Sequence, residues 1–253
     1  MKVPDADQRI AKASSNGAKD ILATGRESAA LGWWFVGMAI AAGLLCPIAF
    51  QFDNSIVGNL DGWDVPGDLK KAIQLSEAFA HGVGATFILL SVFVVVVDRR
   101  RAVVVAIMIT ALSGILANVL KTTVVRVRPY AAGLQVKDHV GSIPANNATE
   151  AITDELALIV ERSIWDTRQR SFPSGHSATA CGLAIGLSLL FPRAWWIFAV
   201  LATFACFQRL ESGAHFLSDV FAGAGIAFLV AACTLFISRT RTMSGLPSQP
   251  LDS

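Results

Sequence analysis

The sequence predicts an all-α fold: a six-transmembrane helical bundle with an amphipathic helix on its extracytoplasmic side. Hydrophobic residues make up 53% of the 253 residues and charged residues only 16%, whereas a soluble domain carries about 25% charge. The apolar residues are also gathered into long runs. A helix needs roughly 20 mostly apolar residues to cross a bilayer core. Six segments approach this length: Leu31–Phe50, Ala72–Val97, Ala102–Leu120, Ser177–Phe191, Ala194–Leu210 and Asp219–Ser238.

These segments divide the chain into a membrane domain, residues 31–238, and two tails, residues 1–30 and 239–253. The fourth and fifth segments are short, and Pro192 between them predicts a tight helical hairpin. Trp195 and Trp196 occupy the place of an interfacial aromatic belt. The first apolar run follows a long charged stretch and is long enough to span, so we expect an uncleaved signal anchor.

The distribution of Lys and Arg predicts the orientation of this domain. These residues are concentrated in the two tails, in the connection at 98–101 and at Arg193, which six spans place on one side. The positive-inside rule then makes both termini cytoplasmic, and the loops after the first, third and fifth spans face the periplasm or outside. The first of those loops is acidic, with Asp53, Asp61, Asp64 and Asp68.

The longest outward segment runs from about Pro129 to Phe172. Residues 151–165 within it are periodic and predict an amphipathic helix lying in the membrane interface. This helix can serve as a lid or lipid-entry element, or as a cap packed over the bundle, and the sequence leaves both open. Its apolar face comprises Ile152, Leu156, Ile159, Val160 and Ile164.

Charge and cysteine usage exclude other classes of protein. The net charge is only +2, and no Lys/Arg block is interleaved with aromatic residues, so no nucleic-acid partner is expected. Nothing in the sequence defines an oligomeric state. The cysteines are far apart inside apolar runs and fit neither a zinc site nor a disulfide framework, so we expect small buried side chains. They are Cys46, Cys181, Cys206 and Cys233.

A first group of polar residues closes the third span. Lys121 and Arg128 are seven residues apart, so on a continuing helix they share a face. Pro129 marks the end of that helix. Two cations on one face suit a phosphate group, since Arg binds two oxygens at once. The alternative is contact with lipid headgroups, which is our interpretation of Arg126, off that face.

A second group precedes the fourth span. Ser174 is a good helix N-cap, and Gly175 lets a ligand approach the backbone closely. Free N–H groups at a helix start form an anion site. His176 lies one residue inside, where its imidazole can protonate a leaving oxygen. Taken alone, the group is also explained as a cap beside an interfacial histidine.

A third group joins the fifth and sixth spans. Arg209 closes the fifth span, and Gly213 permits the chain to reverse. If His215 and Asp219 are helical they share a face, so that the carboxylate orients one imidazole nitrogen and leaves the other as a base or nucleophile. A satisfied polar contact is the alternative. All three groups lie at outward-facing helix ends, and together they predict a phosphate site.

The three motifs resemble the type 2 phosphatidic acid phosphatase (PAP2) family, whose superfamily includes the vanadium haloperoxidases. They occupy residues 121–129, 173–176 and 209–219, with the patterns Lys-x6-Arg-Pro, Pro-Ser-Gly-His and Arg-x5-His-x3-Asp. The spans indicate its membrane lipid phosphatase branch. Gln208 is a departure, because the family usually has Ser before this arginine. Gln still forms hydrogen bonds, although it can alter the position of Arg209.

The resemblance implies a metal-independent phosphoric ester hydrolase acting on a membrane lipid phosphate or diphosphate. His215 attacks phosphorus and forms a phosphohistidine, Asp219 orients it, and His176 protonates the leaving oxygen. No carboxylate cluster suited to Mg²⁺ accompanies the motifs, so neither a metal nor a cofactor is expected. The expected phosphate-binding residues are Lys121, Arg128, Ser174, Gly175 and Arg209.

Several alternatives stay open. The lipid can be phosphatidate, undecaprenyl diphosphate, a lipid A phosphate or another, and a phosphotransferase can use the same site. A non-catalytic transporter or scaffold is expected to carry mid-bilayer charges or matching broken spans, which the sequence lacks, and six spans argue against a haloperoxidase. Near the site, Glu77 and His81 can pair with one another, and Asn118 can orient Lys121.

Overall fold

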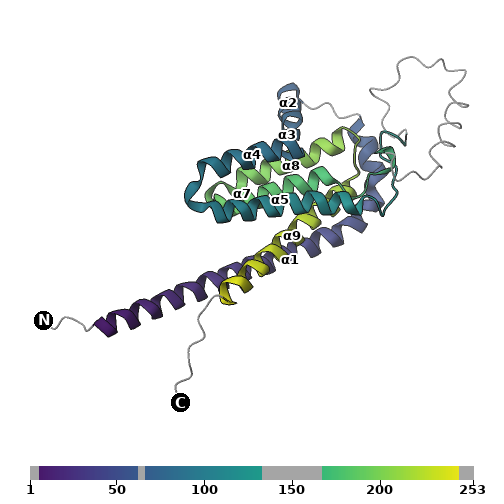
Figure 1. The fold of residues 1–253 in the computed structure, drawn as a ribbon. Helices are drawn as coiled ribbons and strands as arrows, with labels where there is room; N and C mark the ends of the chain where they lie inside the picture. Colours follow the sequence, from purple (N-terminus) through teal and green to yellow (C-terminus); the bar gives the residue numbers. More distant parts are fainter. Residues whose placement is uncertain (1–5, 62–65, 133–166, 245–253) are drawn as a thin grey trace, which may run out of the picture.

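The computed structural model describes residues 6–61, 66–132 and 167–244, and over these ranges its regular structure is helical (Figure 1). One isolated bridge pairs Arg126 with Arg170. The all-α prediction is therefore confirmed for these ranges, while the expected amphipathic helix at 151–165 lies outside them. The α-helices are α1 (Ala6–Asp61), α2 (Gly67–Leu75), α3 (Glu77–Ala80), α4 (Gly82–Val95), α5 (Arg100–Leu120), α7 (Gly175–Leu190), α8 (Trp195–Glu211) and α9 (Leu217–Ser244).

Each of the six expected membrane segments coincides with helical structure, but their lengths differ. Three stretches are long and apolar enough to cross a membrane, namely Ala29–Leu60, Val97–Leu120 and Leu217–Ser238. Helices α7 and α8 have 16 and 17 residues, which is about 24–26 Å of helix against a bilayer core of about 30 Å. Length and composition thus support three crossings, or four with the bent α2–α4 segment, and six remains a prediction.

The second expected span is not the continuous helix that its apolar run predicts. It is broken at Ser76 and His81, with a bend of 73° between its two parts. The Ser76 hydroxyl donates to the Ile73 carbonyl (2.6 Å), and His81 Nδ1 accepts from the Val83 amide as the N-cap of α4. A Cβ at Gly84 would lie 2.0 Å from the Ala78 carbonyl oxygen, so the bend depends on this glycine.

Helix α7 lies at the centre of the bundle, against α5, α8 and α9 (Figure 1). Small residues let it approach its neighbours closely, which is common where helices pack in membranes. A Cβ at Gly186 would lie 2.9 Å from Ala106 Cα, and one at Gly182 would lie 3.2 Å from Thr110 Cα. Eleven of the 16 residues of α7, Gly175 among them, are buried, which leaves this helix little room to move.

Helices α1 and α9 lie side by side and cross the rest of the bundle obliquely (Figure 1). Phe35 stacks on Phe228 (ring centroids 6.2 Å apart), and Trp33 meets Phe236 edge to face (5.5 Å). The start of α1 and the end of α9 both point away from the loops that hold the predicted motifs. This packing carries the C-terminal turns of α1 to the N-terminus of α9.

Helix α5 ends at Leu120, so the expectation that it continues to Arg128 is wrong. The Thr122 and Thr123 hydroxyls donate to the Val119 and Leu120 carbonyls (both 2.7 Å), and this local bonding competes with further helix. The chain then runs extended beside residues 168–171. The amides of Arg126 and Arg128 donate to the carbonyls of residues 169 and 168 (both 2.9 Å).

Candidate active site

The candidate active site lies where α5, α8 and α1 end and α7 and α9 begin. Lys121 follows the last turn of α5, and Gly175 opens α7 beside it. A Cβ at Gly175 would lie 3.1 Å from Asn118 Oδ1 and 3.5 Å from Lys121 Nζ. The structure therefore brings the lysine ammonium and the Asn118 amide to the N-terminus of α7, where a side chain at position 175 would crowd Asn118 Oδ1.

Ser174 is the N-cap of α7, as expected. Its buried hydroxyl oxygen accepts from the Ser177 amide (3.2 Å) and from the Ser177 hydroxyl (2.9 Å), which holds the first turn of the helix. The Ser174 amide donates to the Asp219 carbonyl (3.0 Å). A Cβ at Gly223 would lie 2.4 Å from the Ser174 carbonyl oxygen. The starts of α7 and α9 are thus fixed against each other.

Arg209 is buried at the end of α8 and is held from two sides. Its Nε donates to Gln208 Oε1 (2.5 Å), and its Nη2 forms an ion pair with Glu77 of α3 (2.8 Å). The residue that departs from the usual family pattern therefore still orients the arginine through a hydrogen bond. Gly213 follows with φ 62°, a conformation that favours glycine. It allows the His215 amide to donate to the Arg209 carbonyl (3.1 Å).

His215 precedes α9 rather than lying on it, so the expected shared helical face does not occur. The pair is close nevertheless: Nδ1 lies 3.6 Å from Asp219 Oδ2, a contact longer than a hydrogen bond. Asp219 instead accepts a hydrogen bond from the Phe216 amide (2.9 Å). Phe216 is the residue before α9 and Asp219 its third residue, the arrangement in which a carboxylate binds the amide of the N-cap. Only 1% of His215 is exposed, and burial lowers the pKa of its imidazole to about 4. The ring is therefore neutral at pH 7.

The two remaining cations share the site, and both are partly buried. Burial, followed by the positive charge of Arg128, lowers the pKa of Lys121 to about 8. Burial also lowers the pKa of Arg128, whose Nε has no hydrogen-bond partner among the described residues. A buried donor without a partner is costly, and an anion bound between these side chains would supply one. His176 lies within electrostatic reach of Lys121, Arg209 and His215.

Arg126 is the residue that the sequence reasoning missed. It does not face lipid headgroups. Its Nη1 donates to Asp219 Oδ1 (2.5 Å) and its Nη2 to Asp53 Oδ2 (2.6 Å). Its guanidinium lies 4.7 Å from the Phe50 ring centroid and 4.1 Å from that of Phe216. The sequence holds a signal for this position of Arg126, because residues 126 and 128 lie on the same side of an extended chain. On a helix they would lie on different sides.

Glu77 and His81 border the site but do not pair with each other as the sequence allowed. Glu77 is paired with Arg209, and Lys70 Nζ lies 3.6 Å from Glu211 nearby. The exposed His81 ring lies 5.9 Å from the ring of His176. The described residues contain no cluster of three or more His, Cys, Asp or Glu side chains suited to a metal ion. Their four cysteines are free thiols.

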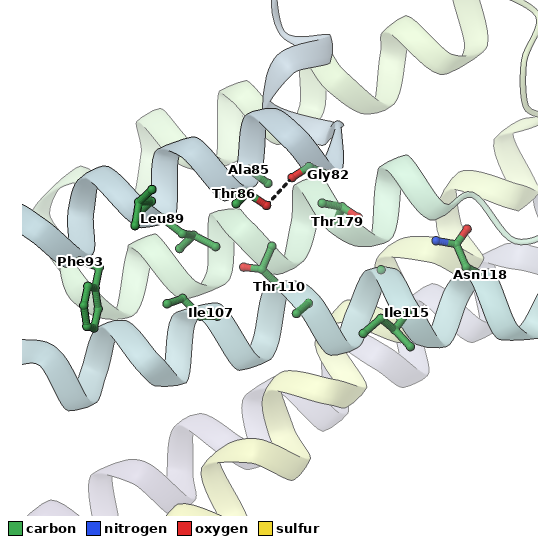
Figure 2. Close-up of a pocket in the computed structure, with 13 residues that line it drawn as sticks. Gly82, Ala85, Thr86, Leu89, Phe93, Ile107, Thr110, Ile115, Asn118 and Thr179 are labelled. Atoms are coloured by element: carbon green, nitrogen blue, oxygen red, sulfur yellow. Dashed lines mark hydrogen bonds between the residues drawn. The ribbon is translucent and has the colours of Figure 1, made fainter.

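An apolar groove of about 480 Å³ runs between α4, α5 and α7 (Figure 2). Figure 2 shows Asn118 at one end of the groove and Phe93 at the other, with Thr110 and Thr179 between them. The Asn118 end adjoins Gly175 and Lys121, and Gly82 in the lining follows His81. The groove therefore begins beside the cationic site and extends along the bundle.

Comparison with known proteins shows which family has this sequence and fold. The sequence profile of the PAP2 superfamily matches residues 102–243. Lipid A 1-phosphatases from Rhizobium etli and Rhizobium johnstonii are each 34% identical over 111 residues, or 44% of this chain. That stretch spans 39% and 37% of the length of these curated relatives.

Two solved structures share the fold. The crystal structure of Aquifex aeolicus LpxE has a TM-score of 0.52 at 20% identity, covering 73% of this chain and 95% of that one. A transmembrane PAP2 type phosphatidylglycerolphosphate phosphatase from Bacillus subtilis has a TM-score of 0.52 at 17% identity, covering 88% and 98%. At these identities the likeness concerns the fold alone.

An apolar bundle with helices long enough to cross a membrane defines an integral membrane protein, and histidines and cations gather at one end of it. The profile match covers more than half of the chain. The chain belongs to the PAP2 superfamily, as its three motifs predict.

Proposed function

We propose that the chain is an integral membrane hydrolase that removes phosphate from a lipid phosphate or diphosphate through a phosphohistidine at His215. One observation carries this proposal: a buried, neutral imidazole has Asp219 against one nitrogen and lies within electrostatic reach of Lys121 and Arg128. A neutral ring has a lone pair for attack, and the adjacent carboxylate stabilises the positive charge that develops on it. These are the requirements for nucleophilic catalysis by histidine.

The reaction runs in two displacements. In the first, the His215 Nε2 lone pair forms a bond to phosphorus while the phosphorus–oxygen bond to the lipid breaks. Burial and the charge of Arg209 lower the pKa of His176 to about 3 in the empty site, so His176 takes up a proton when the phosphate anion binds beside it and gives that proton to the leaving oxygen. In the second, water attacks phosphorus, His176 takes a proton from it, and the bond to His215 breaks to release phosphate. Asp219 orients His215 throughout. This assignment uses each titratable group in one role per step.

The cations and the start of α7 bind the phosphoryl oxygens. Lys121, Arg128 and Arg209 supply fixed positive charge, while Ser174 and the backbone N–H groups near Gly175 supply donors at a helix N-terminus. Phosphoryl transfer depends mostly on positioning and charge stabilisation. A cluster of buried cations is suited to both.

We propose that this chemistry needs no metal ion. The two carboxylates nearest the site already have partners: Asp219 is bonded to Arg126 and Ser171, and Glu77 to Arg209. A divalent cation would have to displace an arginine to bind either of them. Phosphate release should persist in excess EDTA. Loss of activity in EDTA, restored by magnesium, would contradict the proposal.

We further propose that the site faces the periplasm or outside and that six helices cross the membrane, with both termini cytoplasmic. The support is the Lys/Arg content of the tails and of residues 98–101, at the ends of helices away from the site. Single cysteines placed in each tail should be labelled by a membrane-impermeant thiol reagent only after the membrane is opened. Labelling in sealed cells would reverse the orientation.

The groove beside the site indicates a lipid substrate, since an apolar channel that begins at a phosphate site fits an acyl chain. Ala111 lies in its lining and is exposed, so Ala111→Trp fills the groove without entering the core. This variant should raise KM at least about tenfold for a long-chain lipid phosphate but leave p-nitrophenyl phosphate hydrolysis unchanged. The matched control is Ala102→Trp, an exposed position on the same helix outside the groove. Equal losses on both substrates would mean that the site itself is distorted.

The decisive test of the function compares wild-type protein with His215→Ala in liposomes containing phosphatidate, a lipid diphosphate or a lipid A phosphate. Wild-type protein should release free phosphate from at least one of them, and His215→Ala should lose on the order of 10³-fold or more. Wild-type rates in the variant would refute the mechanism. Phosphate recovered on a second lipid instead of in water would make the enzyme a phosphotransferase.

His176→Ala tests the proton-transfer role separately. It should slow release of the lipid alcohol, that is kcat, more than it weakens binding of inorganic phosphate. An unchanged kcat with weaker binding would assign His176 to binding instead.

A further inference from the structure

Helix α1 lies outside the stretch that matches the PAP2 superfamily profile, yet it contributes a buried carboxylate to the candidate site. Asp53 is 2% exposed, and it accepts three hydrogen bonds from two residues. Its Oδ2 accepts from Arg126 Nη2 (2.6 Å) and from the Ser218 hydroxyl (2.5 Å), and its Oδ1 accepts from the Ser218 amide (3.1 Å). Both oxygens of this buried carboxylate therefore have hydrogen-bond donors, as buried polar groups in native structures do.

The charges of this network do not cancel. Arg126 carries one positive charge and is shared by two carboxylates, Asp53 and Asp219. The network therefore keeps one net negative charge, whose Asp219 end lies 3.6 Å from His215 Nδ1. Without Asp53, the guanidinium would neutralise Asp219 alone. Asp219 would then stabilise less of the positive charge that His215 gains on attack.

The same side chain also holds the helix that carries Asp219. By accepting from the Ser218 amide, Asp53 satisfies a donor in the first turn of α9 and places negative charge at the positive end of that helix. Phe50, about one turn earlier on α1, covers one side of the Arg126 guanidinium, and Phe216 covers another. Helix α1 thus fixes both Arg126 and the start of α9.

We propose that α1 positions the nucleophile: Asp53, acting through Arg126 and Ser218, keeps Asp219 aligned against His215 and draws part of the Arg126 charge away from it. Asp53 does not touch the substrate, so it is a positioning residue. The inference rests on the proposed hydrolase function. It adds that a residue outside the family-matched stretch sets the rate of phosphohistidine formation.

The test is Asp53→Asn, which keeps the volume and a hydrogen-bond acceptor for the Ser218 amide but removes the charge. In liposomes, kcat and the single-turnover rate of enzyme phosphorylation should fall about tenfold or more, while KM and inhibition by inorganic phosphate stay within about twofold. The thermal midpoint should fall only slightly, because Arg126 keeps Asp219 as its counter-ion although its Nη2 loses an acceptor. Asp68→Asn is the matched control, because Asp68 is fully exposed and, within the described part of the chain, forms one ion pair, with Lys71 over 3.7 Å.

The outcomes separate this inference from the proposed function. If wild-type protein releases no phosphate from any lipid, the function fails. If wild-type protein is active and Asp53→Asn keeps its kcat, the inference is wrong, and equal changes in kcat and KM contradict it as well. If Asp53→Asn does not fold, Phe50→Leu decides, since this side chain is 61% exposed. It should lower kcat severalfold at constant KM, and an unchanged kcat would overturn the proposal.

Discussion

Arg126 and Arg209 lie on two sides of the same site and are held in different ways. Arg126 bonds two carboxylates that are 2% and 0% exposed, and its guanidinium packs against two aromatic rings. Arg209 pairs with Glu77, whose side chain is 45% exposed, and with the neighbouring Gln208 amide. Arg126 is therefore bonded to buried carboxylates, whereas the carboxylate partner of Arg209 is half-exposed.

This difference shows that exposure and partner number distinguish two functions of the same residue type. A fully paired, buried arginine orients other side chains and contributes to stability. An arginine with a single half-exposed counter-ion can exchange that partner for a phosphate oxygen. Two carboxylates from before residue 102, Asp53 and Glu77, each pair with an arginine of the candidate site.

The largest expected effect is that of Arg126→Gln. It leaves Asp53 and Asp219 buried without a counter-ion, and breaking a buried ion pair from one side costs about 3–5 kcal/mol. The variant should unfold at markedly lower temperature in detergent and should release no phosphate. A wild-type melting midpoint would show that the two carboxylates do not depend on Arg126.

Arg209→Lys should leave the fold intact and lower kcat/KM on the order of 10²-fold. Lysine cannot donate to Gln208 and Glu77 while contacting phosphate with a planar fork, and loss of one preorganised donor has this magnitude. Steady-state kinetics and a melting curve measure both properties. A lowered midpoint with normal kcat/KM would mean that Arg209, like Arg126, is mainly structural.

Lys121→Arg should change the pH dependence of kcat/KM. The free-enzyme pKa of Lys121 is about 8 because of burial and the charge of Arg128, so phosphate binding weakens as pH rises through 8 and the lysine loses its proton. A phosphate monoester has its second pKa at about 6. The fall of kcat/KM above pH 8, the alkaline limb of the profile, therefore belongs to the enzyme. Arginine stays charged, and the limb should move above about pH 9 in the variant. A limb that stays at 8 would assign it to another group.

The smallest expected effect is that of Glu77→Gln. A half-exposed ion pair contributes about 1 kcal/mol or less, so the melting midpoint should hardly change. Since Glu77 competes with phosphate for Arg209, inhibition by inorganic phosphate should become severalfold stronger. Weaker inhibition would instead show that Glu77 orients Arg209.

The sequence predicts the helical class and the three polar motifs because each rests on a local pattern. Apolar runs exclude a soluble fold, and the Ser174 cap follows from its place before a helix. Charged residues are few in this chain, so those at helix ends can be recognised. The roles assigned to His176, His215 and the cations remain predictions for the experiments above.

Features that depend on tertiary contacts escaped sequence reasoning. The sequence places Asp53 in an acidic loop because the apolar run ends at Phe50, but α1 continues to Asp61 and packs Val57 in the interior. Arg126 was assigned to lipid because α5 was expected to continue. Its backbone pairs instead with residues 169–171, far along the chain. An extended chain would place residues 126 and 128 on one side, but no local pattern in either segment identifies the partners.

The measurement that tests the central claim most directly is the trapping of a phosphoenzyme. Wild-type protein given a ³²P-labelled lipid phosphate and denatured in alkali, where phosphohistidine survives, should carry label on the peptide that contains His215. His215→Gln should carry none, while His81→Gln, which changes an exposed histidine nearby, should be labelled like the wild type. Label on another residue, or steady phosphate release by His215→Gln, would contradict the account.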